Sequence, residues 1–374
     1  MRKKQRNASY IRRRKKNPDY IIIFCVAALI IFGLVMLASA SSNLGKVKFN
    51  DTYYYLKHQI LYGLSFGIAG FFLASNIFYK KYEKFAILFL IAAIISLILV
   101  FTPFGFNAKG ASRWIAVGLT TFQPSEFAKL ALIIYLSAWL SGKTERQKSV
   151  KRGFVPFFLV TSLIAGLLLF QPATSTTVIL ILTALIIYFA SGARLAHTFI
   201  FSGIFALIFL ITIYITPYRW DRVVNFINPE ENTETGNYHL IQAKNAIGSG
   251  GLLGVGFGQS TTKLNYLPEP VGDTIFAVIA EEFGFIGVIS LMSVFLLLIT
   301  RILILAYKFS DNFGKLLLTG FGSLIALQTM LHISAISGII PLTGTPLPFI
   351  SFGGTALAAF MTASGVIVNI SKYA

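Results

Sequence analysis

The residue best suited to acid–base chemistry is Asp273, which stands where a polar segment meets an apolar one. It lies four residues after Glu269, and a long apolar run begins at Thr274. An aspartate in this position can cap a helix by accepting hydrogen bonds from the first backbone N–H groups. A carboxylate at the boundary of water and membrane can also take a proton as a general base. Both interpretations of Asp273 stay open here, and Glu269 is the nearest alternative base.

A second group of residues could provide positive charge for an anionic ligand. Glu126 and Lys129 are three residues apart in the sequence QPSEFAK, so they would share one face of a helix. They could form a buried ion pair that holds two helices together, or Lys129 and Arg113 could bind an anion. Arg219 and Lys244, in a later polar segment, are weaker candidates for the same role.

Two further polar features have structural interpretations. The glycines of residues 248–258 match neither GxxxxGK[ST] nor a GxGxxG sequence after a strand, so nucleotide binding is excluded. They could form a flexible turn, or they could let the backbone pack closely against a helix or a substrate. Glu281 and Glu282 lie about two turns into the next apolar run, where hydrogen bonds between helices are expected.

The third polar cluster, residues 341–354, contains three prolines and three glycines, which excludes a helix. Irregular backbone at membrane depth persists only where protein or a water-filled cavity satisfies its polar groups. We therefore expect a re-entrant loop that lines a cavity. His332, at the end of the preceding apolar run, is expected to make a structural hydrogen bond.

Composition identifies the surroundings of these residues as a membrane. Of 374 residues, 55% are hydrophobic and 12% are charged, and the mean hydropathy is +0.73. Soluble domains have about 25% charged residues and disordered chains have low hydrophobicity, so both classes are excluded. The single cysteine, Cys25, lies in an apolar run and excludes an internal disulfide or a Cys-rich metal site.

Ten apolar runs predict an all-α polytopic membrane fold, since a spanning helix needs about 20 mostly apolar residues. The runs are 20–40, 60–77, 85–101, 127–140, 154–170, 176–191, 197–216, 274–304, 313–333 and 351–370. A large loop, 217–272, separates the seventh and eighth runs, and the re-entrant loop precedes the tenth. The fourth run carries Lys129 and the eighth carries Glu281 and Glu282, so these spans must partly face protein or water.

The placement of basic residues predicts the orientation. If ten spans alternate, 22 of the 32 lysines and arginines lie on the side of the two termini, which the positive-inside rule assigns to the cytoplasm. Residues 1–19 then form a basic cytoplasmic tail, residues 20–374 form one transmembrane domain, and 217–272 is extracytoplasmic. The basic tail can act as a topology anchor or contact anionic lipid.

These clusters, in this order, resemble the SEDS family, the FtsW, RodA and SpoVE proteins of bacterial wall synthesis. The matching stretches are 19–42, 111–115, 123–129, 248–254, 267–273 and 341–354. The resemblance implies a peptidoglycan glycosyltransferase, most like the division-type members, that polymerises lipid II on the outer face of the cytoplasmic membrane. It also implies a class B penicillin-binding protein and other divisome or elongasome membrane proteins as partners, and no nucleic acid.

The resemblance also assigns roles to residues. The family's catalytic aspartate falls on Asp273, and its functional Glu and Lys fall on Glu126 and Lys129. Two positions depart from the family pattern, because Ala173 stands where an aspartate is usual and His332 where an asparagine is often seen. The expected substrate-binding residues are Arg113, Glu126, Lys129, Arg219, Lys244 and Glu269.

The implied reaction is attack of a sugar 4-hydroxyl on the anomeric carbon of a glycan held by a polyprenyl pyrophosphate. Asp273 would take the hydroxyl proton, and basic residues would stabilise the leaving pyrophosphate. A divalent cation, Mg²⁺ or Mn²⁺, could assist, but no ligand set in the sequence requires one. One alternative is a lipid II flippase, which should open to both sides and need polar groups deep in the core or on the inner face. The other is a non-enzymatic scaffold for a transpeptidase, which would not need Asp273. A role in division, elongation or sporulation stays open.

Overall fold

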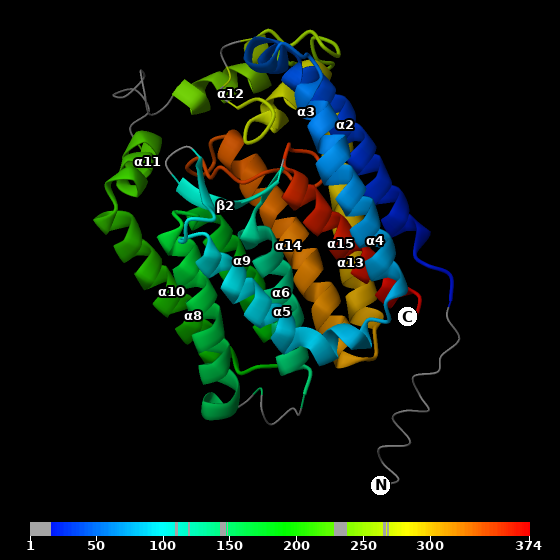
Figure 1. Cartoon of the computed structure of the whole chain (residues 1–374), viewed down its shortest axis with the longest axis vertical. Helices are drawn as coiled ribbons and strands as arrows, with labels where there is room; N and C mark the ends of the chain where they lie inside the picture. The colour runs from blue at the N-terminus through cyan, green and yellow to red at the C-terminus, as the bar shows by residue number, and fades with distance from the viewer. Residues whose placement is uncertain are drawn as a thin grey trace.

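The computed structural model describes residues 16–108, 111–118, 120–142, 147, 149–227, 238–264, 267 and 269–374. Most of the predicted basic tail, residues 1–15, lies outside the described residues, as do 228–237 of the large loop. The described chain is mainly a bundle of long helices (Figure 1). The α-helices are α2 (Tyr20–Phe49), α3 (Tyr54–His58), α4 (Ser65–Asn76), α5 (Lys80–Leu99), α6 (Pro124–Leu140), α8 (Val155–Phe170), α9 (Thr174–Ala190), α10 (Leu195–Ile215), α11 (Pro217–Ile227), α12 (Tyr238–Ser249), α13 (Ile275–Lys308), α14 (Asn312–Ile336) and α15 (Gly354–Ser371).

Each of the ten predicted apolar runs coincides with one of these helices, so the prediction of a polytopic helical membrane protein is confirmed. Eight of the described helical segments are long and apolar enough to cross a membrane. One of the eight joins α3, the π-helical turn η1 (Gln59–Leu64) and α4, and another joins the π-helical turn η2 (Val150–Phe154) to α8. The other two are α9, which is apolar but shorter, and α6, which carries Glu126 and Lys129.

The segments between the spans have more structure than the sequence analysis predicted. Three short antiparallel strands, β1 (Gly105–Ala108), β2 (Ala111–Val117) and β3 (Thr120–Phe122), form a sheet in the order β1-β2-β3. The large loop contains α11, α12 and the 3-10 turn η3 (Thr262–Leu264).

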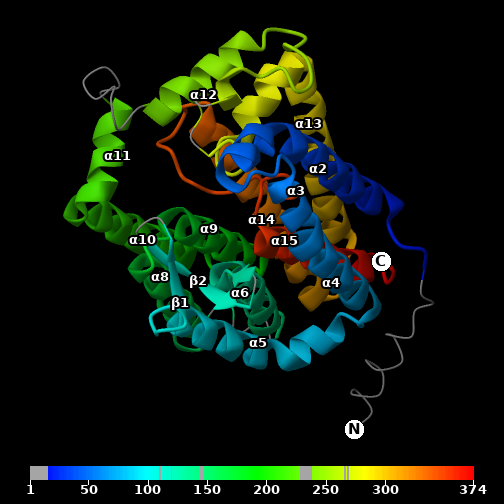
Figure 2. The ribbon, with the colours of Figure 1, turned by 45° about the horizontal axis from the view of Figure 1, so that its top comes forward.

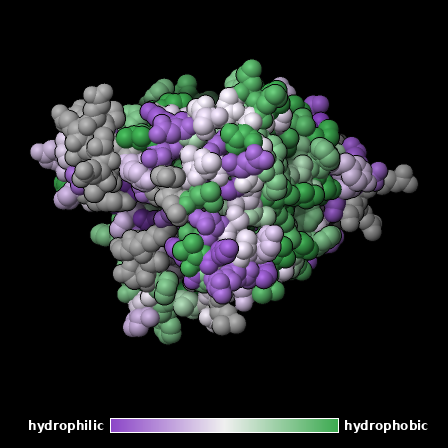
Figure 3. Space-filling view, turned by 90° about the horizontal axis from the view of Figure 1, so that it is seen from above, coloured by the Kyte–Doolittle hydropathy of each residue, from purple (hydrophilic) through white to green (hydrophobic). Residues whose placement is uncertain are grey.

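Figure 1 shows α3, α11 and α12 at one end of the bundle, which we call the upper end, and Figure 2 shows α11 and α12 arching over one side of it. Seen from above, hydrophilic side chains gather across the middle of the upper end, whereas hydrophobic side chains dominate one flank (Figure 3). The polar segments of the sequence are thus collected over the ends of the apolar helices.

The tightest helix packing joins α4 to α15. A Cβ atom placed on Gly67 would lie 2.3 Å from the sulfur of Met361, and one on Gly70 would lie 2.2 Å from the hydroxyl oxygen of Thr362. Small residues at a helix interface let two backbones approach closely, which is a common way for membrane helices to associate. Glycine at these two positions therefore fixes α15 against α4.

Helix α13 is interrupted near its upper end. Gly284 has φ +62° and ψ −163°, outside the helical region. The glycine-rich segment after α12 packs against this break, because the amide of Val255 bonds to the carbonyl of Glu281 and the amide of Gly256 to that of Glu282. A Cβ atom on Gly254 would lie only 2.2 Å from the Glu282 carbonyl oxygen. Gly254 thus has one of the two predicted roles, close backbone packing on a helix, whereas a Cβ atom on Gly251 or Gly258 would meet no atom within 4 Å.

Candidate functional site

A cavity of about 480 Å³ opens beneath α11 and α12 and contains the predicted catalytic residue. Its polar lining comes from five segments of the chain, which are α11, α12, the turn before α13, the end of α14 and the loop 341–345. The lining residues are Asp221, Arg222, Asn225, Phe226, His239, Leu240, Glu269, Asp273, Thr274, His332, Ala335, Ile336, Pro341, Leu342, Thr343, Gly344 and Thr345. The structure therefore brings Asp273 and Glu269 together in one polar cavity, and the proline-rich loop lines it as predicted.

Asp273 lies just outside the first turn of α13. The helix begins at Ile275, and the capping position is Thr274, whose side chain makes no capping hydrogen bond. One carboxylate oxygen of Asp273 packs against Gly344, where a Cβ atom would lie 3.2 Å from Oδ2. Gly344 has φ +62°, a conformation that favours glycine. The absence of a side chain at Gly344 leaves room for the Asp273 carboxylate in the cavity.

The backbone before Asp273 is held by the end of the proline-rich loop. The hydroxyl of Ser351 donates a hydrogen bond of 2.8 Å to the carbonyl of Gly272, and the amide of Phe352 donates one of 2.8 Å to the carbonyl of Val271. The amide of Gly353 in turn donates to Oε1 of Gln59, a buried residue of η1, over 3.0 Å. The turn that carries Asp273 is thus attached to the end of the proline-rich loop, which is itself attached to η1.

His332 makes the structural hydrogen bond expected from the sequence. Its Nδ1 lies 2.6 Å from the carbonyl oxygen of Thr345, and the side chain is buried. Gln328, one turn earlier on α14, holds the same loop through a 2.9 Å bond from Nε2 to the carbonyl of Pro346. Two side chains of α14 therefore hold the backbone of the proline-rich loop.

Arg222 is a cavity residue that the sequence analysis did not single out. Its Nη1 donates a hydrogen bond of 3.0 Å to the carbonyl of Leu342, and the side chain lines the cavity beside Asp221. Arg219, the arginine that was singled out, bonds instead to the carbonyl of Leu169 over 3.1 Å, and burial lowers the pKa of its guanidinium. A helical pattern over residues 217–227 was the sequence signal that could have identified Arg222. In such a helix Arg222 lies one turn from Phe226, and both residues line the cavity.

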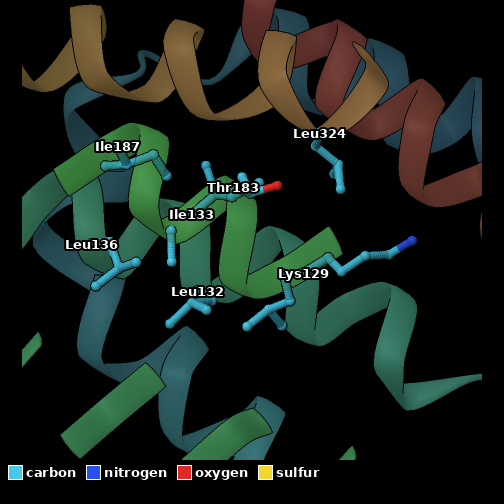
Figure 4. A pocket seen from close by; sticks show the side chains of 9 residues that line it. Lys129, Leu132, Ile133, Leu136, Thr183, Ile187 and Leu324 are labelled. Carbon is cyan, nitrogen blue, oxygen red and sulfur yellow. The ribbon is translucent and has the colours of Figure 1, made fainter. Parts of the chain in front are cut away.

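Glu126 and Lys129 form a buried ion pair inside the bundle. Nζ of Lys129 lies 2.8 Å from Oε1 of Glu126 and 2.8 Å from Oε1 of Gln328, and both charged side chains are less than 5% exposed. The stem of Lys129 borders a small apolar pocket, and Figure 4 shows its amino group extending away from Leu132 and Leu136. Neither charged residue lines the Asp273 cavity, and their predicted part in substrate binding stays a prediction.

The two remaining basic candidates contact the protein itself. Arg113, on β2, donates hydrogen bonds to the carbonyls of Gln171 at 3.1 Å and Pro172 at 2.5 Å. It thus holds the turn in which Ala173 replaces the family's usual aspartate. Lys244 is exposed and lies against Gly338, just after the end of α14. Neither side chain lines the cavity, and a role for either in substrate binding also stays a prediction.

Both glutamates of α13 hold other parts of the chain, and Glu282 makes the expected bond between helices, to α2, whereas Glu281 bonds to the segment around η3. Glu281 accepts hydrogen bonds from the hydroxyl of Ser260 over 2.5 Å and from the amide of Thr261 over 3.0 Å. Glu282 pairs with the buried amino group of Lys263 at 2.6 Å and accepts from the hydroxyl of Ser39 at 2.6 Å. Both carboxylates hold the segment around η3 against α13 and α2.

A divalent cation finds no preformed site in the described part of the chain. No three His, Cys, Asp or Glu side chains among the described residues are grouped so that they could hold a metal ion. Asp221, Glu269 and Asp273 share the cavity but do not form such a group.

Known proteins match this chain over almost its whole length. The family profile for FtsW, RodA and SpoVE, described as "Cell cycle protein", matches residues 19–374. Stage V sporulation protein E of Bacillus subtilis strain 168 is 36% identical over 362 residues, which cover 96% of this chain and 98% of that protein. The probable peptidoglycan glycosyltransferase FtsW of Trichlorobacter lovleyi is 37% identical over 355 residues, with 94% and 93% of the two chains covered.

Solved structures agree with the sequence relatives. A chain from a peptidoglycan synthase complex, studied for the structural coordination of polymerization and crosslinking, superposes with a TM-score of 0.78 at 26% identity, covering 95% of this chain and 97% of that one. The rod shape determining protein RodA of Thermus thermophilus gives a TM-score of 0.70 at 27% identity, covering 95% and 96%. The chain described here therefore belongs to the FtsW, RodA and SpoVE family of polytopic membrane proteins.

Proposed function

We propose that this protein is a peptidoglycan glycosyltransferase that polymerises lipid II, with Asp273 as its general base. The observation that carries the proposal is the position of the Asp273 carboxylate in a polar cavity at the upper end of the bundle. The relatives named as peptidoglycan glycosyltransferases support the reaction class. The residues around the cavity belong to one end of the bundle, which favours an enzyme over a flippase that must open to both sides.

The chemistry follows from the position of the carboxylate. Asp273 takes the proton of the acceptor 4-hydroxyl while the hydroxyl oxygen forms a bond to the anomeric carbon of the donor sugar. The bond from that carbon to the pyrophosphate oxygen breaks, its electron pair leaves with the phosphate, and the configuration at carbon inverts. Arg222 is the cation in the cavity that can stabilise the leaving group electrostatically. Glu269, in the same cavity, can bind sugar hydroxyl groups.

We further assign both termini and residues 1–19 to the cytoplasm, and we treat residues 20–374 as one transmembrane domain. The distribution of basic residues in the sequence supports this orientation. The upper end with its cavity would then face outward, where lipid II must be polymerised. The arrangement would also let the lipid tails of the substrate stay in the membrane during the reaction.

The partner we propose is a class B penicillin-binding protein, a transpeptidase that crosslinks the new strands. A solved relative from a complex that coordinates polymerization with crosslinking supports this choice. The two activities act on the same glycan on the same side of the membrane. Other divisome or elongasome membrane proteins would join this pair.

Polymerisation of lipid II by the purified protein, alone and with the transpeptidase, tests the proposal. Asp273→Asn keeps the shape of the side chain but removes the base, and losing a general base typically costs about 10²–10⁴-fold in rate. We expect the variant to fold and bind the transpeptidase, yet to make little or no glycan. Asp221→Asn, in the same cavity, is the matched control and should retain most of the activity. Near-normal polymerisation by Asp273→Asn would contradict the assignment and move attention to Glu269.

A further inference from the structure

Among the described residues, His332 bonds through only one of its two ring nitrogens. Nδ1 lies 2.6 Å from the carbonyl oxygen of Thr345, and because a carbonyl oxygen can only accept, Nδ1 carries the proton. The side chain is 1% exposed and lines the cavity that contains Asp273. The hydrogen bond to Thr345 thus fixes both the orientation of the ring and its tautomer.

The other nitrogen, Nε2, is buried and has no hydrogen-bond partner among the described residues. With the proton on Nδ1, the Nε2 of a neutral ring is an acceptor. Buried polar atoms are nearly always hydrogen-bonded, and the side chain that carries Nε2 lines the cavity, so a ligand bound in the cavity is a candidate partner for this acceptor.

The position of His332 indicates which part of a ligand would supply that partner. Thr345, which holds His332, directly follows Gly344, against which the Asp273 carboxylate packs. The two side chains are therefore held by consecutive residues of one loop, on the wall of one cavity. A group bound by Nε2 must carry a proton to donate, which selects hydroxyl and amide N–H groups.

We propose that Nε2 of His332 accepts a hydrogen bond from a hydroxyl or amide N–H group of the sugar that binds beside Asp273. This inference rests on the proposed function, because it takes the cavity to be the sugar site. It adds a substrate-binding residue where the family resemblance leads us to expect asparagine, whose shorter side chain has no atom at the position of Nε2.

Two substitutions separate the two nitrogens of the ring. In His332→Asn the side-chain amide can replace Nδ1 and keep the bond to Thr345, but nothing replaces Nε2. In His332→Gln the longer amide can bring an oxygen to the position of Nε2, and the bond to Thr345 is lost. Thr329→Val is the matched control, because Thr329 lies one turn earlier on α14 and does not line the cavity. Its hydroxyl is also buried and has no hydrogen-bond partner in the described part of the chain.

The experiment measures the KM and kcat of lipid II polymerisation for the full-length protein, and the Kd for lipid II in an Asp273→Asn background that cannot turn over. A hydrogen bond that is equally strong in the bound substrate and in the transition state contributes to binding but not to kcat. Its loss should raise KM and Kd by roughly 3- to 10-fold with little change in kcat. We expect this for His332→Asn, with partial recovery in His332→Gln and wild-type values for Thr329→Val. Apparent melting temperatures show whether each variant is folded.

Three results would overturn the inference. If His332→Asn folds and matches the wild type in KM and Kd, Nε2 contacts only water. An equal loss in Thr329→Val would mean that any buried change in α14 has the same effect. If His332→Asn does not fold, His332→Gln is compared with His332→Ala, which lacks both nitrogens. A His332→Gln protein that folds but binds lipid II as weakly as His332→Ala would also contradict the inference. Failure of the wild-type protein to polymerise lipid II, in contrast, would refute the proposed function itself.

Discussion

The hydroxyl of Ser351 donates a hydrogen bond of 2.8 Å to the carbonyl of Gly272, the residue directly before Asp273. The same hydroxyl accepts a bond of 2.8 Å from the amide of Leu347. One buried side chain therefore connects the turn that carries the Asp273 carboxylate to the backbone of the proline-rich loop. The position of Asp273 depends on residues nearly 80 positions away in the sequence.

Removing this connection should reduce catalysis more than binding. In Ser351→Ala the turn before Asp273 loses its bond to the loop, and a displacement of about 1 Å can lower a rate by about 10²-fold. We expect kcat to fall by about 10- to 100-fold, with a Kd for lipid II close to that of the wild type. Ser364→Ala removes a buried serine of α15 that bonds only within its own helix, and it should leave kcat unchanged. Equal kcat values for the two variants would show that Ser351 does not position Asp273.

The buried pair of Glu126 and Lys129 should contribute mainly to stability. Lys129→Ala leaves the Glu126 carboxylate buried without its partner, and breaking a buried pair in this way costs about 3–5 kcal/mol. We expect a clear loss of thermal stability in detergent, measured by size-exclusion chromatography after heating. The double variant Glu126→Gln with Lys129→Met has no buried charge at this site and should recover most of the lost thermal stability.

The exposed pair of Lys57 and Asp51 provides the comparison. Its two side chains are 68% and 34% exposed, so water screens their attraction, and Lys57→Ala should leave the melting temperature almost unchanged. The bond to Lys57 lowers the pKa of the Asp51 carboxyl group. Any stability from Asp51 is therefore present at neutral pH and is lost as the pH falls through that lowered value. A Lys129→Ala protein as stable as Lys57→Ala would contradict the assignment of Glu126 and Lys129.

Two glycines with almost the same backbone conformation should respond differently to alanine. Gly254 and Gly258 have φ of +80° and +79°, so both substitutions carry the strain of a side chain at positive φ. At Gly254 the new Cβ would also collide with the backbone of Glu282, whereas no atom lies within 4 Å at Gly258. Gly254→Ala should therefore be less stable than Gly258→Ala by about 1–3 kcal/mol. Equal melting temperatures would mean that the glycine-rich segment can separate from α13 at little cost.

The orientation can be tested with single cysteines and a thiol reagent that does not cross membranes. Ser249→Cys, at the end of α12, should be labelled from outside, and Ser310→Cys, between α13 and α14, only after the cells are opened. Both positions are exposed, and the native Cys25 is fully buried, so background labelling should be low. Thr233 and Lys148, which lie outside the described residues, should behave like Ser249 and Ser310 respectively. Reversed labelling would refute both the orientation and the outward cavity.

The long helices could be predicted from the sequence because each is a run of apolar residues, and even α6 was detected despite Lys129. The three strands were missed because each is short and lies in a polar segment. Arg222 was missed because Arg219 lies one turn away on the same short helix, and only the packing of α11 decides which arginine faces the cavity. The contact between Asp273 and Gly344 joins residues about 70 positions apart in the sequence. The periodicity of apolar residues predicts helices but not contacts between such distant residues.

The close seam between α4 and α15 has a mechanical consequence. The glycines at this seam have no side chains that could rearrange. The loop that supports Asp273 leads directly into α15 at Gly354, and a Cβ atom placed on Gly63 would lie 3.2 Å from the Cα of Gly354. We therefore expect this half of the molecule to be the more rigid one. On the other side, α10, which leads into α11, has the smallest buried share of the eight spans, 11% against 72% for α15. The part of the cavity wall that carries Asp273 should thus stay in place, and the cavity should widen or narrow as α11 moves together with α10.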